Sequence, residues 1–284
     1  MTELRTCTDK KPIPFMKIKW LFILASLFFI AMSGYEIIYN GLNFGVDFLG
    51  GTKLIYKFDA SANIKEIRTA VNELKIGDVQ VIKFGNNPSQ NQFMMRAKYV
   101  KDVDVAKLVH DQLVKAFGAD KITQLSEEVV GPKVGQDLQK KGMLSILFTC
   151  ALILIYIGFR FDFLFSPGAI FALMHDVIIS VGFFAYFGKE FNLPILAALL
   201  TIIGYSINDT IVIYDRIREN IKKFPKNTPA SDVINVSITE TIRRTLVTSL
   251  TSLLVVTTLF VLGGGVLHDF AFCLIVGISF GTYS

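Results

Sequence analysis

The sequence predicts a multi-pass α-helical membrane protein with six transmembrane helices and a small α+β domain inserted between the first two. Of its 284 residues, 52% are hydrophobic and 19% are charged, whereas charged residues make up about 25% of typical soluble domains. The charges are unevenly distributed, because 27 of the 53 lie between Gly41 and Lys141 and several long stretches carry none. This pattern excludes a disordered protein, a collagen-like chain and an ordinary soluble enzyme.

Six apolar segments are candidates for membrane spans, since a hydrocarbon core about 30 Å thick needs about 20 apolar residues per helix. We predict them at 18–39, 142–159, 164–187, 194–214, 246–265 and 269–284. The first is longer than a signal-peptide core and no small-residue cleavage site follows it, so we expect it to be retained. The domains are then a cytoplasmic N-terminus at 1–17, the first span, an extracytoplasmic domain at 40–141 and spans two to six at 142–284. We expect the last helix to be truncated at Ser284.

Lys and Arg residues near the span ends predict the orientation in the membrane. Thirteen of them lie on the side of the N-terminus, namely before or at the start of span one and in the loops after spans two and four. The short loops of the opposite side carry only Lys189. Short cytoplasmic loops are enriched in Lys and Arg. We therefore expect both termini in the cytoplasm and residues 40–141 on the outer side.

The polar insert predicts a ferredoxin-like domain with the order βαββαβ. Alternating apolar and polar residues predict strands at 53–58, 79–84, 92–98 and 121–130. One helix begins after Asn63, with Glu66 three residues later in capping-box spacing, and a second follows Asp102. This order is the split βαβ arrangement. The fold carries many unrelated functions and does not identify one.

The sequence contains no pattern typical of enzymes, metal sites or nucleic-acid binding. Gly50-Gly51-Thr52 lacks the remaining parts of a phosphate-binding loop, and no Walker motif, nucleophile elbow or C-x-x-C pair is present. The basic residues lie beside apolar spans instead of forming one dense patch. We therefore expect no enzymatic activity, no cofactor, no bound metal and no nucleic-acid partner.

Asp209 is the clearest functional candidate, because ionisable side chains inside spans are costly and are usually functional. Taking about 1.5 Å per residue, it lies about 7 Å to the cytoplasmic side of the centre of span four. A carboxylate there is expected to stay protonated or to find a cation. We expect it to handle protons or to pair with an ion; a structural hydrogen bond between helices is the alternative. Arg244 at the start of span five either anchors that helix at the headgroups or reaches inward to Asp209.

His175 and Asp176 form a second ionisable cluster near the middle of span three. Histidine titrates near neutral pH, so the pair could relay protons. It could equally be a buried polar contact that locks neighbouring helices together. The sequence leaves both interpretations open.

Four motifs resemble those of the SecD/SecF family, part of the resistance-nodulation-division superfamily. The first includes Asp47, Gly50, Gly51 and Thr52, and another includes Asn208 and Asp209. The matching stretches are Gly45–Thr52, Val130–Gly135, Ser206–Val212 followed by Asp215–Asn220, and Arg244–Leu246 with Thr248 and Ser249. Six spans with one small first domain are similar to the SecF-like members, because the outer domain of SecD-like members is much larger.

The resemblance implies an accessory subunit of protein export in the bacterial cytoplasmic (inner) membrane. Members of the family pair with a SecD-like subunit, work with the SecYEG channel, YajC and the SecA motor, and act on a translocating preprotein. They use the proton-motive force, so that protons are the coupling ion. The proton path of the family maps here onto Asp209 and Arg244. Two alternatives remain open from the residues alone, namely a half-transporter that exports a lipid or small molecule, and a passive membrane scaffold.

Overall fold

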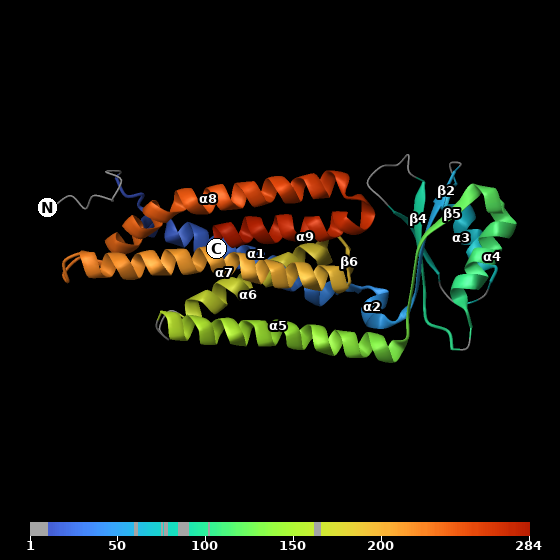
Figure 1. Cartoon of the computed structure of the whole chain (residues 1–284), viewed down its shortest axis with the longest axis horizontal. Helices are drawn as coiled ribbons and strands as arrows, with labels where there is room; N and C mark the ends of the chain where they lie inside the picture. The colour runs from blue at the N-terminus through green and yellow to red at the C-terminus, as the bar shows by residue number, and fades with distance from the viewer. Residues whose placement is uncertain are drawn as a thin grey trace.

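The computed structural model describes residues 11–59, 62–74, 76, 79–84, 91–101, 103–161 and 166–284. Long helices lie side by side in an elongated bundle, and a four-stranded sheet with two helices caps one end of the bundle (Figure 1). The two helices cover the face of the sheet that points away from the bundle. The protein is thus a helical bundle that carries one compact domain at one end.

Six helices build the bundle within the described residues: α1 Phe15–Tyr39, α5 Pro132–Arg160, α6 Ser166–Tyr186, α7 Leu193–Lys223, α8 Ala230–Leu262 and α9 Gly264–Tyr283. Five are long and apolar enough to cross a membrane, while the apolar part of α9, Leu267–Tyr283, is shorter. Large apolar side chains on α1, α5 and α8 point outward, such as Phe28 at 64% and Phe159 at 83% exposure. Soluble monomers rarely expose such surfaces, so these helices indicate a membrane protein.

The sheet domain, residues 51–130, follows the strand and helix order that the sequence predicts. Its elements are β2 Gly51–Phe58, α3 Ile64–Asn72, β3 Gln80–Phe84, β4 Gln92–Ala97, α4 Val105–Phe117, the short 3₁₀ helix η2 Ala119–Lys121 and β5 Ile122–Val130. The strands are antiparallel in the order β3-β4-β2-β5. Tyr56, Ile67 and Leu113 are fully buried between the sheet and its helices. The domain thus has its own hydrophobic core.

The helix starts in this domain follow the capping rule, with one difference from the sequence prediction. Asn63 caps α3 by accepting a hydrogen bond from the Lys65 backbone N–H at 3.0 Å. The cap of α4 is Asp104, which accepts from the Lys107 N–H at 3.0 Å. The predicted start after Asp102 was therefore two residues early, and Asp102 itself lies outside the described residues. Two aspartates precede the same apolar run, and composition alone does not distinguish them.

The junction between the sheet domain and the bundle contains elements that the sequence analysis missed. They are β1 Asn43–Phe44, α2 Val46–Leu49 and β6 Glu190–Phe191, and β1 pairs in parallel with β6. Asp47 on α2 accepts a hydrogen bond from the Leu193 N–H at 2.9 Å, so it caps the start of α7. This bond fastens the segment before the sheet directly to a helix of the bundle.

Helices α7 and α8 continue well past the predicted ends of spans four and five at the end of the bundle remote from the sheet domain, called here the distal end. Arg216 Nε donates to Glu240 Oε2 at 2.6 Å across this extension. Asn220 Nδ2 donates to Ser237 Oγ at 3.0 Å in the same pair of helices. These contacts hold α7 and α8 antiparallel and set the register of the site between them.

Candidate functional site

Asp209 lies near the middle of α7. Its side chain is buried with 6% exposed, and its Oδ2 atom has no hydrogen-bond partner within the described part of the chain. Nearly all buried polar atoms in proteins have a partner. The unpartnered oxygen therefore marks Asp209 as a candidate functional group.

The register of α7 against α8 decides which residues face Asp209. The Tyr205 hydroxyl donates to Ser249 Oγ at 3.2 Å. Because the helices are antiparallel, one further turn toward the distal end leads to Asp209 on α7 and to Thr245 on α8. The neighbouring Arg244 interacts electrostatically with the Asp209 carboxylate, although no ion pair or hydrogen bond joins the two in the described structure. The fold thus places both predicted residues in one layer.

A cavity of about 480 Å³ opens beside this layer toward the distal end. Asn208, Thr241 and Arg244 line its inner part, and each is next to Asp209 in sequence or within one turn of Thr245. The rest of the lining is mostly charged and includes Arg160, Asp215, Arg216, Glu219 and Glu240. The cavity offers solvent a route from the distal end to the neighbours of Asp209.

His175 and Asp176 are buried on α6, and the structure brings them next to α7. His175 Nδ1 lies 2.8 Å from Asp176 Oδ1, while Ser206 Oγ donates to Asp176 Oδ2 at 2.6 Å. The Ser284 hydroxyl donates to the same oxygen at 3.1 Å. Ser206 is three residues from Asp209 on α7, so the two ionisable clusters share one polar layer.

Hydroxyl groups extend this layer to α8 and α9. Thr282 Oγ1 on α9 lies 2.7 Å from Ser249 Oγ, which also accepts from Tyr205. The sequence placed Ser206 in a family motif without assigning it a role, and Thr282 belonged to no motif. Hydroxyl residues are common in membrane helices and mostly serve packing, so their spacing alone carried no signal.

The glycine-rich motif lies at the junction with the sheet domain, whereas Asp209 lies more than four helical turns along α7 from the junction. Gly50 has a φ of +75°, and a side chain there would meet Pro132 Cα at 2.8 Å. Gly51 has a φ of +147°, and a Cβ at this position would meet the Ala97 carbonyl oxygen at 2.6 Å. Thr52 is buried in β2. The motif therefore permits close backbone packing where α5 and β4 meet the start of the sheet.

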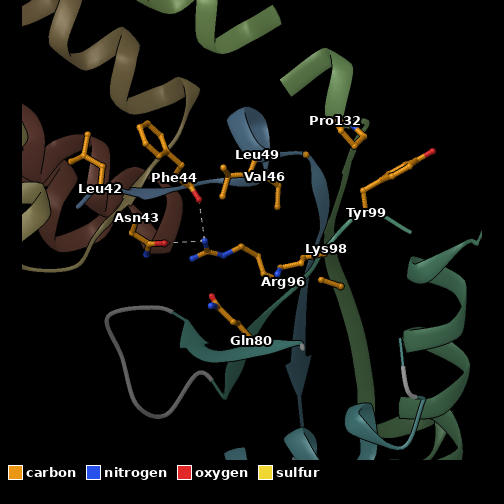
Figure 2. Close-up of a pocket in the computed structure, with 12 residues that line it drawn as sticks. Leu42, Asn43, Phe44, Val46, Leu49, Gln80, Arg96, Lys98, Tyr99 and Pro132 are labelled. Carbon is orange, nitrogen blue, oxygen red and sulfur yellow. Dashed lines mark hydrogen bonds between the residues drawn. The ribbon is translucent and has the colours of Figure 1, made fainter. Parts of the chain in front are cut away.

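Arg96 on β4 connects the sheet domain to the bundle beside this motif. Figure 2 shows its guanidinium between the Asn43 side chain and the Phe44 carbonyl, at 3.3 and 3.5 Å. A second terminal nitrogen lies 3.4 Å from Glu190 Oε2, and both side chains of this ion pair are about nine-tenths buried. Burial raises the pKa of the Glu190 carboxyl above its ordinary value, while the charges of Arg96 and Lys53 oppose the shift.

A cavity of about 520 Å³ surrounds the guanidinium, and mainly apolar residues such as Leu42, Val46 and Leu49 form its wall (Figure 2). It is larger than the cavity near Asp209, but its described lining contains no carboxylate. Across the described residues, no three His, Cys, Asp or Glu side chains are grouped so that they could hold a metal ion. The polar layer around Asp209 is therefore the candidate functional site of the bundle.

Comparison with known proteins identifies the family. Residues 109–284 match the family model of the protein export membrane protein SecD/SecF C-terminal region, and residues 40–62 match the SecD/SecF GG motif. The protein translocase subunit SecF of Vibrio alginolyticus is 42% identical, covering 97% of this chain and 87% of its own length. The SecF subunit of Calditerrivibrio nitroreducens is also 42% identical, over 93% of this chain and 87% of the relative.

A solved structure agrees with this family in its fold. The crystal structure of SecDF from Thermus thermophilus, titled a translocon-associated membrane protein, superposes with a TM-score of 0.86 at 35% identity. The match covers 98% of this chain, but this chain spans only 37% of the solved chain. A model matching well over half of the sequence and relatives above 40% identity lead to the same conclusion: the chain belongs to the SecD/SecF family of protein export membrane proteins.

Proposed function

We propose that the protein is an accessory subunit of the Sec protein translocase that uses the proton-motive force to promote export. Family membership supports the role in export, and the observation that carries the coupling is the buried Asp209 carboxylate in one layer with Arg244. One proton moving down about 150 mV releases about 3.5 kcal/mol. A few protons would suffice to drive a domain movement. Protons are then the only coupling agent, and no other cofactor is required.

The partners follow from the relatives and from the resemblance. The solved relative is named SecDF, and this chain matches about a third of it, which supports a SecD-like subunit as the partner. The outward-facing apolar surfaces of α1, α5 and α8 are available for such a subunit and for lipid. We extend the proposal to the SecYEG channel, YajC, SecA and the translocating preprotein on the family resemblance alone.

The proposal includes six spans, with α9 as the sixth, and a ferredoxin-like assignment for the sheet domain. It places the protein in the bacterial inner membrane with both termini in the cytoplasm and the sheet domain outside. The strand order β3-β4-β2-β5 and the two helices on one face support the domain assignment. The distribution of Lys and Arg supports the orientation.

Export assays in inverted membrane vesicles test the function. Vesicles that contain this protein and its SecD-like partner should export a preprotein faster when a proton gradient is present. An uncoupler should remove this gain and leave the ATP-driven export unchanged. A gain that persists with the uncoupler would contradict the use of protons, and no gain at all would contradict the role in export.

Cysteine labelling tests the orientation. A cysteine that replaces the exposed Lys107 on α4 should react with a membrane-impermeant thiol reagent in intact cells with a permeable outer layer, because the sheet domain is expected outside. A cysteine at the exposed Lys226, between α7 and α8, should react only after the membrane is opened. Mass shifts of the labelled protein measure both reactions. The reverse pattern would overturn the assignment of sides.

A further inference from the structure

Two buried polar atoms face the same layer between α7 and α8 without a partner. Asp209 Oδ2 and Thr245 Oγ1 both lack a hydrogen bond within the described residues. Their side chains are only 6% and 8% exposed. Buried groups without a protein partner commonly bind an ordered water. Finding two in one layer points to a shared ligand.

The register places these two atoms at the same level. Tyr205 and Ser249 form a direct hydrogen bond across the two helices. Asp209 follows Tyr205 by four residues, and Thr245 precedes Ser249 by four residues. On antiparallel helices both steps are about 6 Å in the same direction. Asp209 and Thr245 therefore lie opposite each other, one helical turn from the Tyr205–Ser249 contact toward the distal end.

Thr245 also differs from other hydroxyl residues of α8. Thr248, Thr251 and Thr258 each donate to a backbone carbonyl one turn back in their own helix, at 3.1, 2.9 and 2.9 Å. This local bond is how Thr normally satisfies its hydroxyl within a helix. Within the described residues the Thr245 hydroxyl makes no such bond and remains available to another group.

We propose that Asp209 and Thr245 together bind one water molecule and that this water delivers the proton to Asp209. The proposal rests on the proposed function, since it adds the proton donor to the Asp209 site. In the step, a hydronium ion at this position loses one proton to Asp209 Oδ2, which leaves a carboxylic acid and a neutral water, and no electrons move. Thr245 Oγ1 accepts a hydrogen bond from an O–H of the hydronium and so positions it, and it can donate to the neutral water that remains.

Contacts on both sides of this water connect it to the rest of the protein. One turn closer to the sheet domain, the hydroxyls of Tyr205 and Thr282 both donate to Ser249 Oγ, across α7, α8 and α9. Toward the distal end, the cavity of about 480 Å³ reaches Thr241 and Arg244, which lie within one turn of Thr245. The water thus lies between this hydroxyl cluster and the cavity that opens toward the distal end.

Thr245→Val tests the site, because valine keeps the shape of threonine and removes the hydroxyl. Thr245→Ser keeps the hydroxyl, and Thr251→Val is the matched control, since Thr251 is exposed and its hydroxyl is bonded within its own helix. In the vesicle assay, Thr245→Val should reduce the gradient-dependent gain in export about tenfold. This is the size of effect expected from losing one hydrogen bond to a charged group. Thr245→Ser and Thr251→Val should retain the gain. Retention by Thr245→Val would overturn the proposal.

Infrared spectroscopy of the full chain with its partner in lipid gives a measurement independent of export. A bound-water O–H band that shifts in oxygen-18 water should disappear both in Asp209→Asn and in Thr245→Val, and should remain in Thr251→Val. A spectrum without such a band, or a band unaffected by Thr245→Val, would overturn the water site. If the band behaves as expected while Asp209→Asn still exports with its full gradient-dependent gain, the site stands and the proposed function fails.

Discussion

The Asp209→Asn variant is expected to insert and assemble normally and to lose the whole gradient-dependent gain in export. Asparagine keeps the shape of aspartate, but it cannot take up and release a proton. Asp209 is buried in the middle of α7 and lies in one layer with Arg244, whose charge acts on its carboxylate. Export into vesicles with and without a proton gradient measures the effect.

Asp137→Asn is the control, because it also replaces one carboxylate by an amide but lies at an exposed position on α5 that does not line the cavity beside Asp209. The control should export like the unchanged protein. Copurification with the SecD-like partner checks assembly in both variants. A full gradient-dependent gain in Asp209→Asn would eliminate Asp209 as the proton carrier, and loss of export together with assembly would indicate a structural role.

The Arg96→Ala variant is expected to destabilise the junction between the sheet domain and the bundle by about 3–5 kcal/mol, the usual cost of removing one partner of a buried ion pair. The substitution leaves Glu190 buried without its cation and removes the bonds to Asn43 and to the Phe44 carbonyl. Thermal unfolding in detergent and the rate of proteolysis near β1 measure the loss. Lys98→Ala, at an exposed position two residues away, should change neither.

Glu190→Gln is the second control, and it also tests how the stability of the junction depends on pH. Burial raises the pKa of Glu190 in the folded protein, so the folded state holds the proton more tightly than the unfolded chain. Stability from this group is therefore greatest below the unfolded pKa of about 4.3 and declines as pH rises through the raised folded pKa. Glu190→Gln should remove this decline, and Arg96→Ala combined with it should be milder than Arg96→Ala alone. An unchanged pH profile would contradict this account of the junction.

The sequence predicted features that depend on local pattern. Uninterrupted apolar runs predicted the apolar helices of the bundle and alternation predicted the strands of the sheet domain, while a carboxylate inside a predicted span singled out Asp209, which is buried. Their physical causes act over a few neighbouring residues, namely transfer into lipid, side-chain periodicity and the cost of a buried charge. Such features are therefore visible without knowledge of the fold.

The features that the sequence did not predict depend on residues far apart in the chain. Strands β1 and β6 are two residues each and meet only because the fold brings positions 43 and 190 together. Neither has enough length for a periodic pattern. The Ser206–Asp176 and Thr282–Ser249 contacts likewise need the packing of α6, α7, α8 and α9. Sequence reasoning left open whether Asp176 approaches the helix of Asp209, and the fold shows that it does.

The Asp47 cap has a mechanical consequence. Helix α7 runs without interruption from Leu193, which Asp47 holds, to Asp209 and beyond. At about 1.5 Å per residue, about 24 Å of rigid rod separates the capped end from the carboxylate. An α-helix hardly compresses along its axis, so an axial shift at Asp209 reaches the base of the sheet domain almost undiminished. In the proposed function, a change of charge at Asp209 that shifts α7 along its axis would therefore displace the segment before the sheet domain as well.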